Sequence, residues 1–263
     1  MPEMDRGRCV TSFGIGRRSR TFEQTYPLME EYAGIVGADF YVPEDSFFDD
    51  FIEKNIELNW DARSAPTWLK IPLVSHLLEK YDEVLWLDAD VVVTGQDDVF
   101  LEAQDSPIAM TLLDVDAGSV ANTGVWLSRK PAKEFIDNIE INPRVAYGSR
   151  RWREVGYDGE MPMILDALGV DVKARHIEPP TSSIFGELDY KFHVNLDDKR
   201  GVPENAVFFH SLGVGLEWIF SAIVTYNIWD LQRYYRTVHH KDPPGKANTN
   251  NTWTSGKRGC CRK

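Results

Sequence analysis

The fold of this chain is organised around the segment Tyr81-Asp82-Glu83-Val84-Leu85-Trp86-Leu87-Asp88-Ala89-Asp90-Val91-Val92-Val93-Thr94. Its four apolar residues at 84–87 predict a buried parallel strand, and two carboxylates follow where that strand ends. In open α/β sheets the ligand crevice lies beyond the carboxyl ends of the strands. We therefore expect Asp88 and Asp90 to face such a crevice together.

An Asp-x-Asp pair in this position has two interpretations. Its carboxylate oxygens suit Mg²⁺ or Mn²⁺, and such an ion commonly takes further ligands from substrate phosphates. Alternatively, the two Asp residues only cap a turn. The apolar strand before the pair and the three valines at 91–93 favour the metal site, because they hold the carboxylates inside the protein, where acids need a partner cation.

Length and charge limit the class of protein. With 263 residues, 43% of them hydrophobic, the chain fits a single α/β domain, which we place at residues 1–238. The net charge of −12 argues against nucleic acid as a partner. The charge is uneven, because residues 239–263 carry six Lys or Arg against one Asp. This basic segment is rich in Asn, Thr, Pro and Gly, which predicts a mobile tail.

Cysteine usage and the first residues bear on localisation. Three cysteines, at positions 9, 260 and 261, form no disulfide framework and suit a reducing compartment. Residues 1–6 lack the apolar core of a signal peptide, and no run approaches the length of a membrane-spanning helix. We expect a soluble, cytoplasmic protein without a transmembrane segment.

The remaining elements follow from periodicity and turn signals. A β-α-β unit opens the chain, and a helix with apolar residues on one face leads into the Asp-x-Asp strand. An aromatic-rich helix near the end could contact the core, a second copy of the chain or a membrane surface. We expect strands at 9–13, 38–42, 84–87, 107–112, 124–127, 170–177 and 206–210, and helices at 21–34, from 69 onward, 131–139, 163–168 and 216–235.

Several other polar residues are candidate ligands, each with a plainer interpretation. Arg17 lies in a basic loop after the first strand, where arginine forks suit diphosphates, although loop arginines are commonly just solvated. Lys70 lies at a helix start, where it could reach phosphates or be a surface residue. Asn122 precedes Thr123-Gly124 on an expected turn, where Asn commonly bonds its own backbone. His210 ends an apolar run, either as a ligand or as a hydrogen-bonded core residue.

The order of these pieces resembles a known family. Lys70, the Asp-x-Asp strand, Asn122-Thr123-Gly124, an acidic helix start and His210-Ser211-Leu212-Gly213 together look like a GT-A glycosyltransferase, over roughly residues 9–213. The chain is most similar to the retaining groups that contain glycogenin, the lipopolysaccharide galactosyltransferases and the Golgi galactosyl- and xylosyltransferases. The resemblance implies a Rossmann-like nucleotide-diphospho-sugar transferase fold, with a mixed sheet flanked by helices, a C-terminal helix and the flexible tail.

The resemblance also implies the reaction and its ligands. Such an enzyme moves a sugar from a nucleoside-diphosphate sugar to a glycan or other hydroxyl acceptor, here with retention. A UDP-sugar is favoured and a GDP-sugar is the alternative donor. The cofactor would be Mn²⁺ or Mg²⁺, held by Asp88, Asp90 and His210.

The other site residues are carried over in the same way. Asn122 would face the donor sugar or the acceptor, and Asp158 or Glu160 would correspond to the acid of the Asp-Gln pair usual in that family. This chain has Glu160-Met161 instead, which leaves open which residue lies beside the anomeric carbon. The base, ribose and diphosphate would be bound by Val10, Thr11, Ser12, Arg17, Lys70 and Asp88.

Two alternatives come from other classes. Asp88 and Asp90 also fit the aspartyl-phosphate motif of haloacid-dehalogenase-like phosphatases, with Thr111 and the acids at 197–198 as later members. That family places its nucleophile on the first strand of its core, whereas here a β-α-β unit precedes the motif. The second alternative is an inactive sugar-nucleotide-binding protein.

Overall fold

The computed structural model describes residues 7–15, 19–44, 46–54, 65–102, 106–142, 149–155, 157, 160–173, 175–195, 200 and 203–210. In the first half of the chain the elements are β1 (Arg8–Thr11), α1 (Ser19–Ile35), β2 (Asp39–Tyr41), α2 (Ser46–Lys54), α3 (Ala65–Trp68), α4 (Lys70–Leu77), β3 (Glu83–Leu87) and β4 (Val91–Val93). The second half contains η3 (Val99–Leu101), β5 (Ile108–Val115), β6 (Gly118–Arg129), η4 (Lys130–Ala132), α5 (Lys133–Asp137), α7 (Arg150–Glu154), α8 (Met161–Ala167), β7 (Val172–Lys173), β8 (His176–Ile177), β9 (Phe185–Leu188), η5 (Tyr190–Phe192), β10 (Val194–Asn195) and β11 (Phe208–His210).

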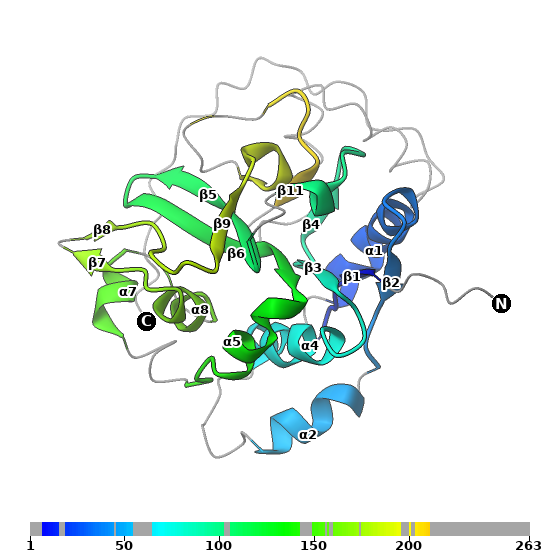
Figure 1. Cartoon of the computed structure of the whole chain (residues 1–263), viewed down its shortest axis with the longest axis horizontal. Helices are drawn as coiled ribbons and strands as arrows, with labels where there is room; N and C mark the ends of the chain where they lie inside the picture. Colours follow the sequence, from blue (N-terminus) through cyan, green and yellow to red (C-terminus); the bar gives the residue numbers. More distant parts are fainter. Residues whose placement is uncertain are drawn as a thin grey trace.

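The main sheet is mixed, in the order β2-β1-β3-β6-β5-β9 (Figure 1). Strand β1 is parallel to β2 and to β3, which confirms the opening β-α-β unit. Strand β6 runs antiparallel to both β3 and β5. A second, three-stranded sheet joins β10, β11 and β4. The predicted α/β architecture, with a mixed sheet flanked by helices, is confirmed.

Alternate residues of the central strands enter two different hydrophobic cores. Val84 and Trp86 of β3 belong to the core that includes α4, α5, α7 and α8, while Leu85 and Leu87 belong to the core with α1 and the small sheet. Successive side chains of a strand point to opposite faces, so a strand covered on both faces must be apolar throughout. This is why the predicted run at 84–87 has no polar position.

Helix α4 ends just before β3 and delivers it to the centre of the sheet. Pro72 lies in the first turn of the helix, where its missing N–H removes no intrahelical bond. Lys70 is the first residue of the helix and is only 1% exposed, so its interpretation as a surface residue is wrong. Its ammonium group contacts Asp88 and not bulk solvent.

Two expected elements differ from the sequence prediction. Asn122, Thr123 and Gly124 lie inside β6 and not on a turn, because β6 extends from the hairpin at Gly118 through to its pairing with β3. The single edge strand expected at 170–177 is instead the short antiparallel hairpin β7–β8, in which Val172 pairs with Ile177.

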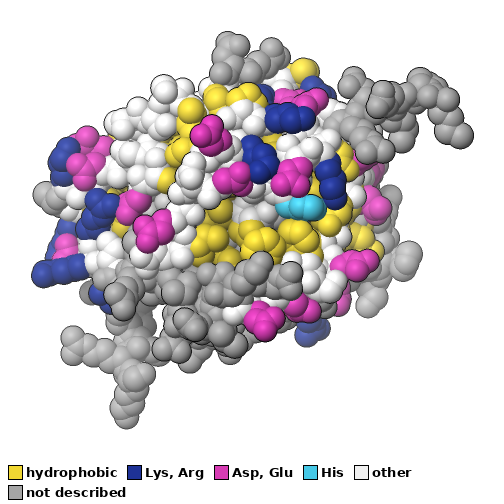
Figure 2. Space-filling model, turned by 60° about the horizontal axis from the view of Figure 1, so that its bottom comes forward, with side chains coloured by type: hydrophobic (Ala, Val, Ile, Leu, Met, Phe, Trp, Pro, Cys, Tyr) yellow, Lys and Arg dark blue, Asp and Glu magenta, His cyan; other side chains and the backbone are white. Residues whose placement is uncertain are grey.

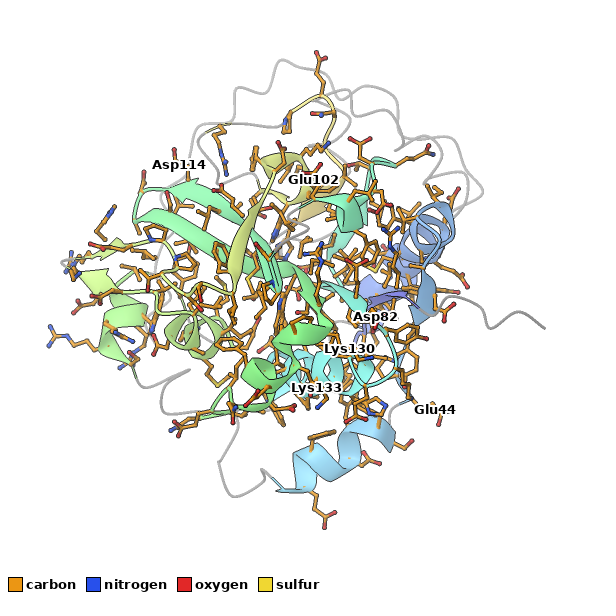
Figure 3. All side chains as sticks on the ribbon, viewed as in Figure 1. Glu44, Asp82, Glu102, Asp114, Lys130 and Lys133 are labelled. Carbon is orange, nitrogen blue, oxygen red and sulfur yellow. The ribbon has the colours of Figure 1, made fainter. Side chains whose placement is uncertain are left out.

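The surface carries mixed charge. On the face around α4 and α5, basic and acidic side chains lie among each other (Figure 2). Lys130 donates to Asp82 at 3.3 Å, and Lys133 donates to Asp137 at 2.7 Å (Figure 3). Within the described part of the chain, no helix is both long and apolar enough to cross a membrane. The aromatic helix expected at 216–235 and the tail lie outside the described residues.

Candidate functional site

The Asp-x-Asp segment is a short connection between β3 and β4, held on both sides. The N–H of Asp88 donates to the carbonyl of Gly124 at 2.8 Å, and the N–H of Val91 donates back to the carbonyl of Asp88 at 2.9 Å. The hydroxyl of Thr25 on α1 donates to the carbonyl of Ala89 at 2.7 Å. The backbone that carries the two carboxylates is therefore fixed by the sheet and by α1.

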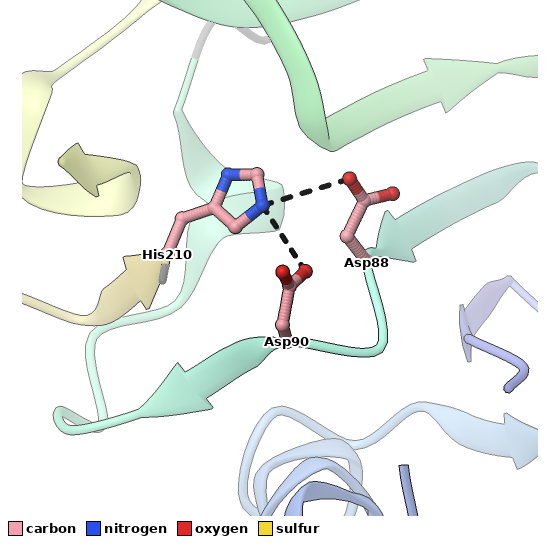
Figure 4. Close-up of side chains that lie close together, drawn as sticks. All are labelled: Asp88, Asp90 and His210. Carbon is pink, nitrogen blue, oxygen red and sulfur yellow. Dashed lines mark hydrogen bonds and ion pairs between the residues drawn. The ribbon is translucent and has the colours of Figure 1, made fainter. Parts of the chain in front are cut away.

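His210 reaches the same place from the far end of the described chain. Strand β11 pairs with β4 so that His210 lies opposite Val91, one residue after Asp90. His210 Nε2 is 3.2 Å from Asp90 Oδ1 and 3.7 Å from Asp88 Oδ2 (Figure 4). Ligand atoms of these three residues all lie within 4.8 Å of one another. Two residues close in sequence and one that is 120 positions away thus form one cluster.

Gly124 makes room for the His210 ring. A Cβ at position 124 would lie 2.4 Å from His210 Cε1 and 2.6 Å from Nδ1, closer than any side chain tolerates. The Oδ1 atom of Asn122 accepts a hydrogen bond from the N–H of Gly124 at 2.9 Å, and the pairing of β5 with β6 is irregular here, between Met110 and Leu112. The Asn-x-Gly segment of β6 therefore shapes the wall against which the histidine packs.

Lys70 lies between two carboxylates. Its Nζ is 2.8 Å from Asp88 Oδ1 and 2.8 Å from Glu160 Oε1. The carbonyl of Thr123 accepts from the same Nζ at 3.3 Å, and the Thr123 hydroxyl donates to Glu160 at 3.2 Å. Lys70 is 1% exposed and Glu160 7% exposed, so the ion pair is buried beside the cluster.

The two oxygens of Asp88 have different surroundings. Oδ1 accepts hydrogen bonds from Lys70 and from the indole Nε1 of Trp86 at 2.7 Å. Oδ2 is the atom that faces His210. One oxygen of Asp88 is thus held by protein donors, and the other is directed into the cluster.

A pocket of about 430 Å³ lies directly against these residues. Its aromatic and apolar side is formed by Phe13 and Trp86, whose rings are 5.1 Å apart. The full lining consists of Phe13, Ile15, Thr67, Lys70, Trp86, Asp88, Ala89 and Asp90. A pocket that combines apolar and aromatic walls with convergent charged groups is a common form of small-molecule site.

Burial and neighbouring charges set the protonation of the site. Burial by itself would lower the pKa of Lys70, but the Asp88 and Glu160 carboxylates more than offset it and raise that pKa. For Glu160, burial works toward a higher pKa, and Lys70 reverses it so that the pKa is lowered. The two groups therefore stay ionised together.

His210 and its neighbour His193 respond in opposite directions. Against the effect of burial, Asp90 and then Asp88 raise the pKa of His210. His193 is fully buried, and burial together with the charges of His210 and Lys70 holds its pKa well below the usual range. Its Nε2 lies 2.9 Å from Nδ1 of His210.

The donor set fits a divalent cation. Two carboxylates and one imidazole are ligands that Mn²⁺ accepts, and the imidazole favours Mn²⁺ over Mg²⁺. Asp88, Asp90 and Glu160 bring three negative charges to the site, against the single fixed positive charge of Lys70. A bound cation would balance this excess of negative charge.

No protein-family model matches the sequence, and no curated protein matches it. Among solved structures, the chain is similar to a glycosyltransferase involved in the glycosylation of the major capsid of PBCV-1, with 17% identity, 81% of this chain and 96% of that chain covered, and a TM-score of 0.52. It is also similar to the galactosyltransferase LgtC in complex with donor and acceptor sugar analogs, with 12% identity, 89% and 95% coverage and a TM-score of 0.50. An active-site mutant of LgtC matches at 13% identity, with the same coverage and a TM-score of 0.51.

The fold is that of a GT-A glycosyltransferase. At such low identities the likeness establishes the fold and leaves the activity to the chemistry of the site. In this fold Lys70, Asp88 and Asp90 line one pocket, and His210 forms a cluster with the two Asp residues.

Other predicted site residues lie differently in the GT-A fold. Val10 packs in the core with α1, and the Thr11 hydroxyl donates to the carbonyl of Tyr41 at 2.8 Å. The Ser12 hydroxyl is buried and has no hydrogen-bond partner among the described residues. From this segment the pocket is lined by Phe13 and Ile15. The base and ribose contacts expected of residues 10–12 stay a prediction.

Two predicted residues cannot be placed in the site, and two residues that were not predicted contact it. Arg17 and Asp158 lie outside the described residues, so their roles also stay predictions. Sequence reasoning did not single out Trp86, which donates to Asp88, or His193, which contacts His210. Trp86 is recognisable as a strand residue two positions before Asp88 with a hydrogen-bond donor, whereas His193 follows a short 3₁₀ helix and has no local signal.

Proposed function

We propose that this protein is a metal-dependent glycosyltransferase that moves a sugar from a nucleoside-diphosphate sugar, with a UDP-sugar favoured, to a hydroxyl group of a glycan or other acceptor. The single observation that carries this proposal is the Asp88, Asp90 and His210 cluster, which borders a pocket in a GT-A fold. Asp88 and Asp90 come from the connection between β3 and β4 and line the pocket, and His210 comes from the end of β11.

Asp90 and His210 would hold the cation, and Asp88 would share it through Oδ2. Asp88 Oδ1 is already engaged by Lys70 and Trp86, which keeps the carboxylate plane in one orientation. A divalent cation bound there would stabilise the negative charge that develops on the departing nucleoside diphosphate. Mn²⁺ is the proposed ion, because of the imidazole ligand.

Lys70 and Glu160 would act on the diphosphate and the transferred sugar. Lys70 lines the pocket, so its positive charge lies where phosphate oxygens would be bound. Glu160 is kept ionised by Lys70 and accepts a hydrogen bond from Thr123, which suits a carboxylate that orients sugar hydroxyls. Glu160 therefore takes the place of the acid of the family's Asp-Gln pair. Asn122, whose Oδ1 bonds Gly124, would face the donor sugar or the acceptor with its remaining amide group.

Retention of configuration belongs to the same proposal and rests on the sequence resemblance to the retaining groups. In a retaining transfer the acceptor hydroxyl arrives on the face that the diphosphate leaves, and a phosphate oxygen can take its proton. An inverting enzyme needs a carboxylate base on the opposite face. Glu187 of β9 and Asp189 after it are acids that could serve as such a base. Both are exposed, and Asp189 accepts a hydrogen bond from the N–H of Lys191 at the start of η5.

A screen of donors tests the proposal most directly. A ligand that binds only the native state raises its melting temperature, so UDP-, GDP- and dTDP-sugars are compared with and without Mn²⁺. We expect a UDP-sugar to give the largest increase, and only in the presence of Mn²⁺. Stabilisation by none of the donors, or the same stabilisation with EDTA, would contradict the proposal.

Turnover separates the alternatives. The haloacid-dehalogenase-like mechanism needs its nucleophile after the first strand of its core, whereas Asp88 follows β3, which lies beside β1 in the sheet. A glycosyltransferase should slowly hydrolyse its sugar nucleotide donor and leave p-nitrophenyl phosphate intact. An inactive binding protein would be stabilised by the donor without hydrolysing it. NMR of a product made from an α-linked donor should show an α linkage, and a β linkage would overturn retention.

A further inference from the structure

His210 uses both of its ring nitrogens. Nε2 faces Asp90 and Asp88 at 3.2 and 3.7 Å, on the side where the proposed cation would bind. Nδ1 faces Nε2 of His193 at 2.9 Å, and the two ring centroids are 5.0 Å apart. Both side chains are buried, His210 at 6% exposure and His193 at 0%. The contact between them is therefore shielded from bulk solvent.

The chemistry of imidazole restricts how this pair can be protonated when a cation is bound. A ring nitrogen that binds a cation must present its lone pair, so Nε2 of His210 carries no proton in that state. The single proton of the neutral ring is then on Nδ1, and Nδ1–H needs an acceptor in this buried place. Among the described residues, the acceptor in contact with it is Nε2 of His193. His193 must then carry its own proton on Nδ1, a buried atom near the backbone of Asn122 that makes no hydrogen bond of standard geometry among the described residues.

Packing alone does not explain a histidine at position 193. Its neighbours in sequence, Phe192 and Val194, are fully buried in the hydrophobic core with α1 and β4. A hydrocarbon side chain would fill such a position without the cost of removing an imidazole from water. The position also follows directly from the local structure, because Asp189 caps η5 and β10 begins at Val194. The 193 side chain is thereby directed at β11.

We infer that His193 is a positioning residue, whose Nε2 accepts the Nδ1–H of His210 and so directs the Nε2 lone pair of His210 toward a cation held with Asp88 and Asp90. This inference rests on the proposed function, because it assumes the cation site. It adds a partner that holds the metal ligand in one orientation and one tautomer. Loss of a partner of this kind typically weakens metal binding by about 10- to 100-fold.

The test compares Mn²⁺ binding to the full chain and to three variants. His193→Phe keeps a ring of similar size and removes the acceptor. His193→Gln places an amide oxygen near the position of Nε2 and restores it. The control is Trp152→Phe, which removes a buried indole hydrogen bond to Asp166 at 2.8 Å in the other core. Free Mn²⁺ is counted by electron paramagnetic resonance, without nucleotide or sugar, so the readout does not depend on activity.

We expect His193→Phe to bind Mn²⁺ about 10- to 100-fold more weakly than the parent. His193→Gln should recover most of the affinity, and Trp152→Phe should bind like the parent even if it melts at a lower temperature. Should His193→Phe not fold, His193→Leu carries the same comparison. A parent that binds Mn²⁺ together with a Phe variant that binds it equally well would overturn the inference alone, as would a Gln variant as weak as Phe. A parent that binds no Mn²⁺ would overturn the proposed function and this inference together.

Discussion

The two ends of strand β3 both carry charged residues, and they are built in opposite ways. At the amino end, Glu83 accepts from Arg8 at 3.2 Å and from Arg129 at 2.8 Å. At the carboxyl end, Lys70 pairs with Asp88 and Glu160, and His210 contacts Asp88 and Asp90. The first end balances two arginines against two acids, Glu83 and Asp98, whereas the second has more acids than fixed cations.

The amino end is a closed network. Arg129 also donates to the carbonyls of Ser106, Phe100 and Glu102, at 2.7, 3.2 and 3.0 Å. Arg8 further donates to Asp98 at 2.9 Å. Each charged group there has its partners within the protein, so the network ties β1, β3 and β6 together without needing a ligand.

The carboxyl end carries an excess of acidic groups. Its acids are brought together by β3, β4 and α8, and the Lys70 charge cannot balance all of them. We therefore expect the balanced charges at the amino end to stabilise the fold and the unbalanced acids at the carboxyl end to serve binding. Substitutions at the two ends should accordingly affect different measurements.

Asp90→Ala should have the largest effect on binding. It removes the carboxylate nearest to His210, so Mn²⁺-dependent binding of UDP should fall by about 100-fold or more, because the ion loses one of few protein ligands. Titration calorimetry with and without Mn²⁺ measures this loss. The control is Asp97→Asn, at an exposed acid that pairs with Lys191. Unchanged Mn²⁺-dependent binding in Asp90→Ala would show that the ion binds elsewhere.

Arg129→Met should have the largest effect on stability. It removes one of the two arginine donors to Glu83 and the Arg129 hydrogen bonds to three backbone carbonyls, which costs about 2–3 kcal/mol of unfolding free energy. Urea unfolding measures the cost, and Mn²⁺ affinity should not change. Arg150→Met, at an exposed pair with Glu154, should cost almost nothing. If Arg129→Met lost Mn²⁺ binding while it remained folded, the two ends of β3 would not be independent.

Gly124→Ala should weaken Mn²⁺ binding more moderately. The added Cβ would require the His210 ring to move, so we expect about a tenfold loss of affinity, in the range caused by displaced ligand partners. The matched control is Gly34→Ala in α1, where an added Cβ has nothing within 4 Å and should slightly stabilise the helix. Equal Mn²⁺ affinity in the two variants would contradict the close packing of His210 against β6.

Cys9 lies on β1 and pairs with Val84 of β3, between the two ends of that strand. Its substitution should have the smallest effect on stability, and the effect should depend on pH. Burial raises the pKa of the Cys9 thiol from 9.0 to about 12. In the unfolded chain the thiol loses its proton above pH 9, while the folded protein keeps it until about pH 12, so this contribution to stability is lost as the pH rises through that window.

Cys9→Ala should therefore change the pH dependence of stability. Between pH 8 and 10 the parent should lose about 1 kcal/mol more unfolding free energy than the variant does. Urea unfolding at the two pH values, under reducing conditions, makes the comparison. Parallel losses in both proteins would indicate that the thiol is accessible to solvent.

Much of the fold followed from local patterns. The apolar run at 84–87 predicted a buried central strand because a strand covered on both faces cannot carry polar residues. The β-α-β opening followed from the periodicity of apolar residues in the first part of the chain and from its turn signals. Asn122 was placed on a turn because its turn propensity is a local property, whereas the long pairing of β6 with β3 and β5 overrides it.

The candidate site divides in the same way. The sequence alone predicts that Asp88 and Asp90 end a buried strand, and the order of motifs indicates that Lys70 and His210 belong with them. Three contacts are visible only in the tertiary structure. Lys70 bonds both Asp88 and Glu160. Gly124 leaves room for the His210 ring, and His193 contacts that ring. Strand character depends on neighbours along the chain, whereas these contacts depend on sheet register and on groups that are distant in sequence, which no local pattern encodes.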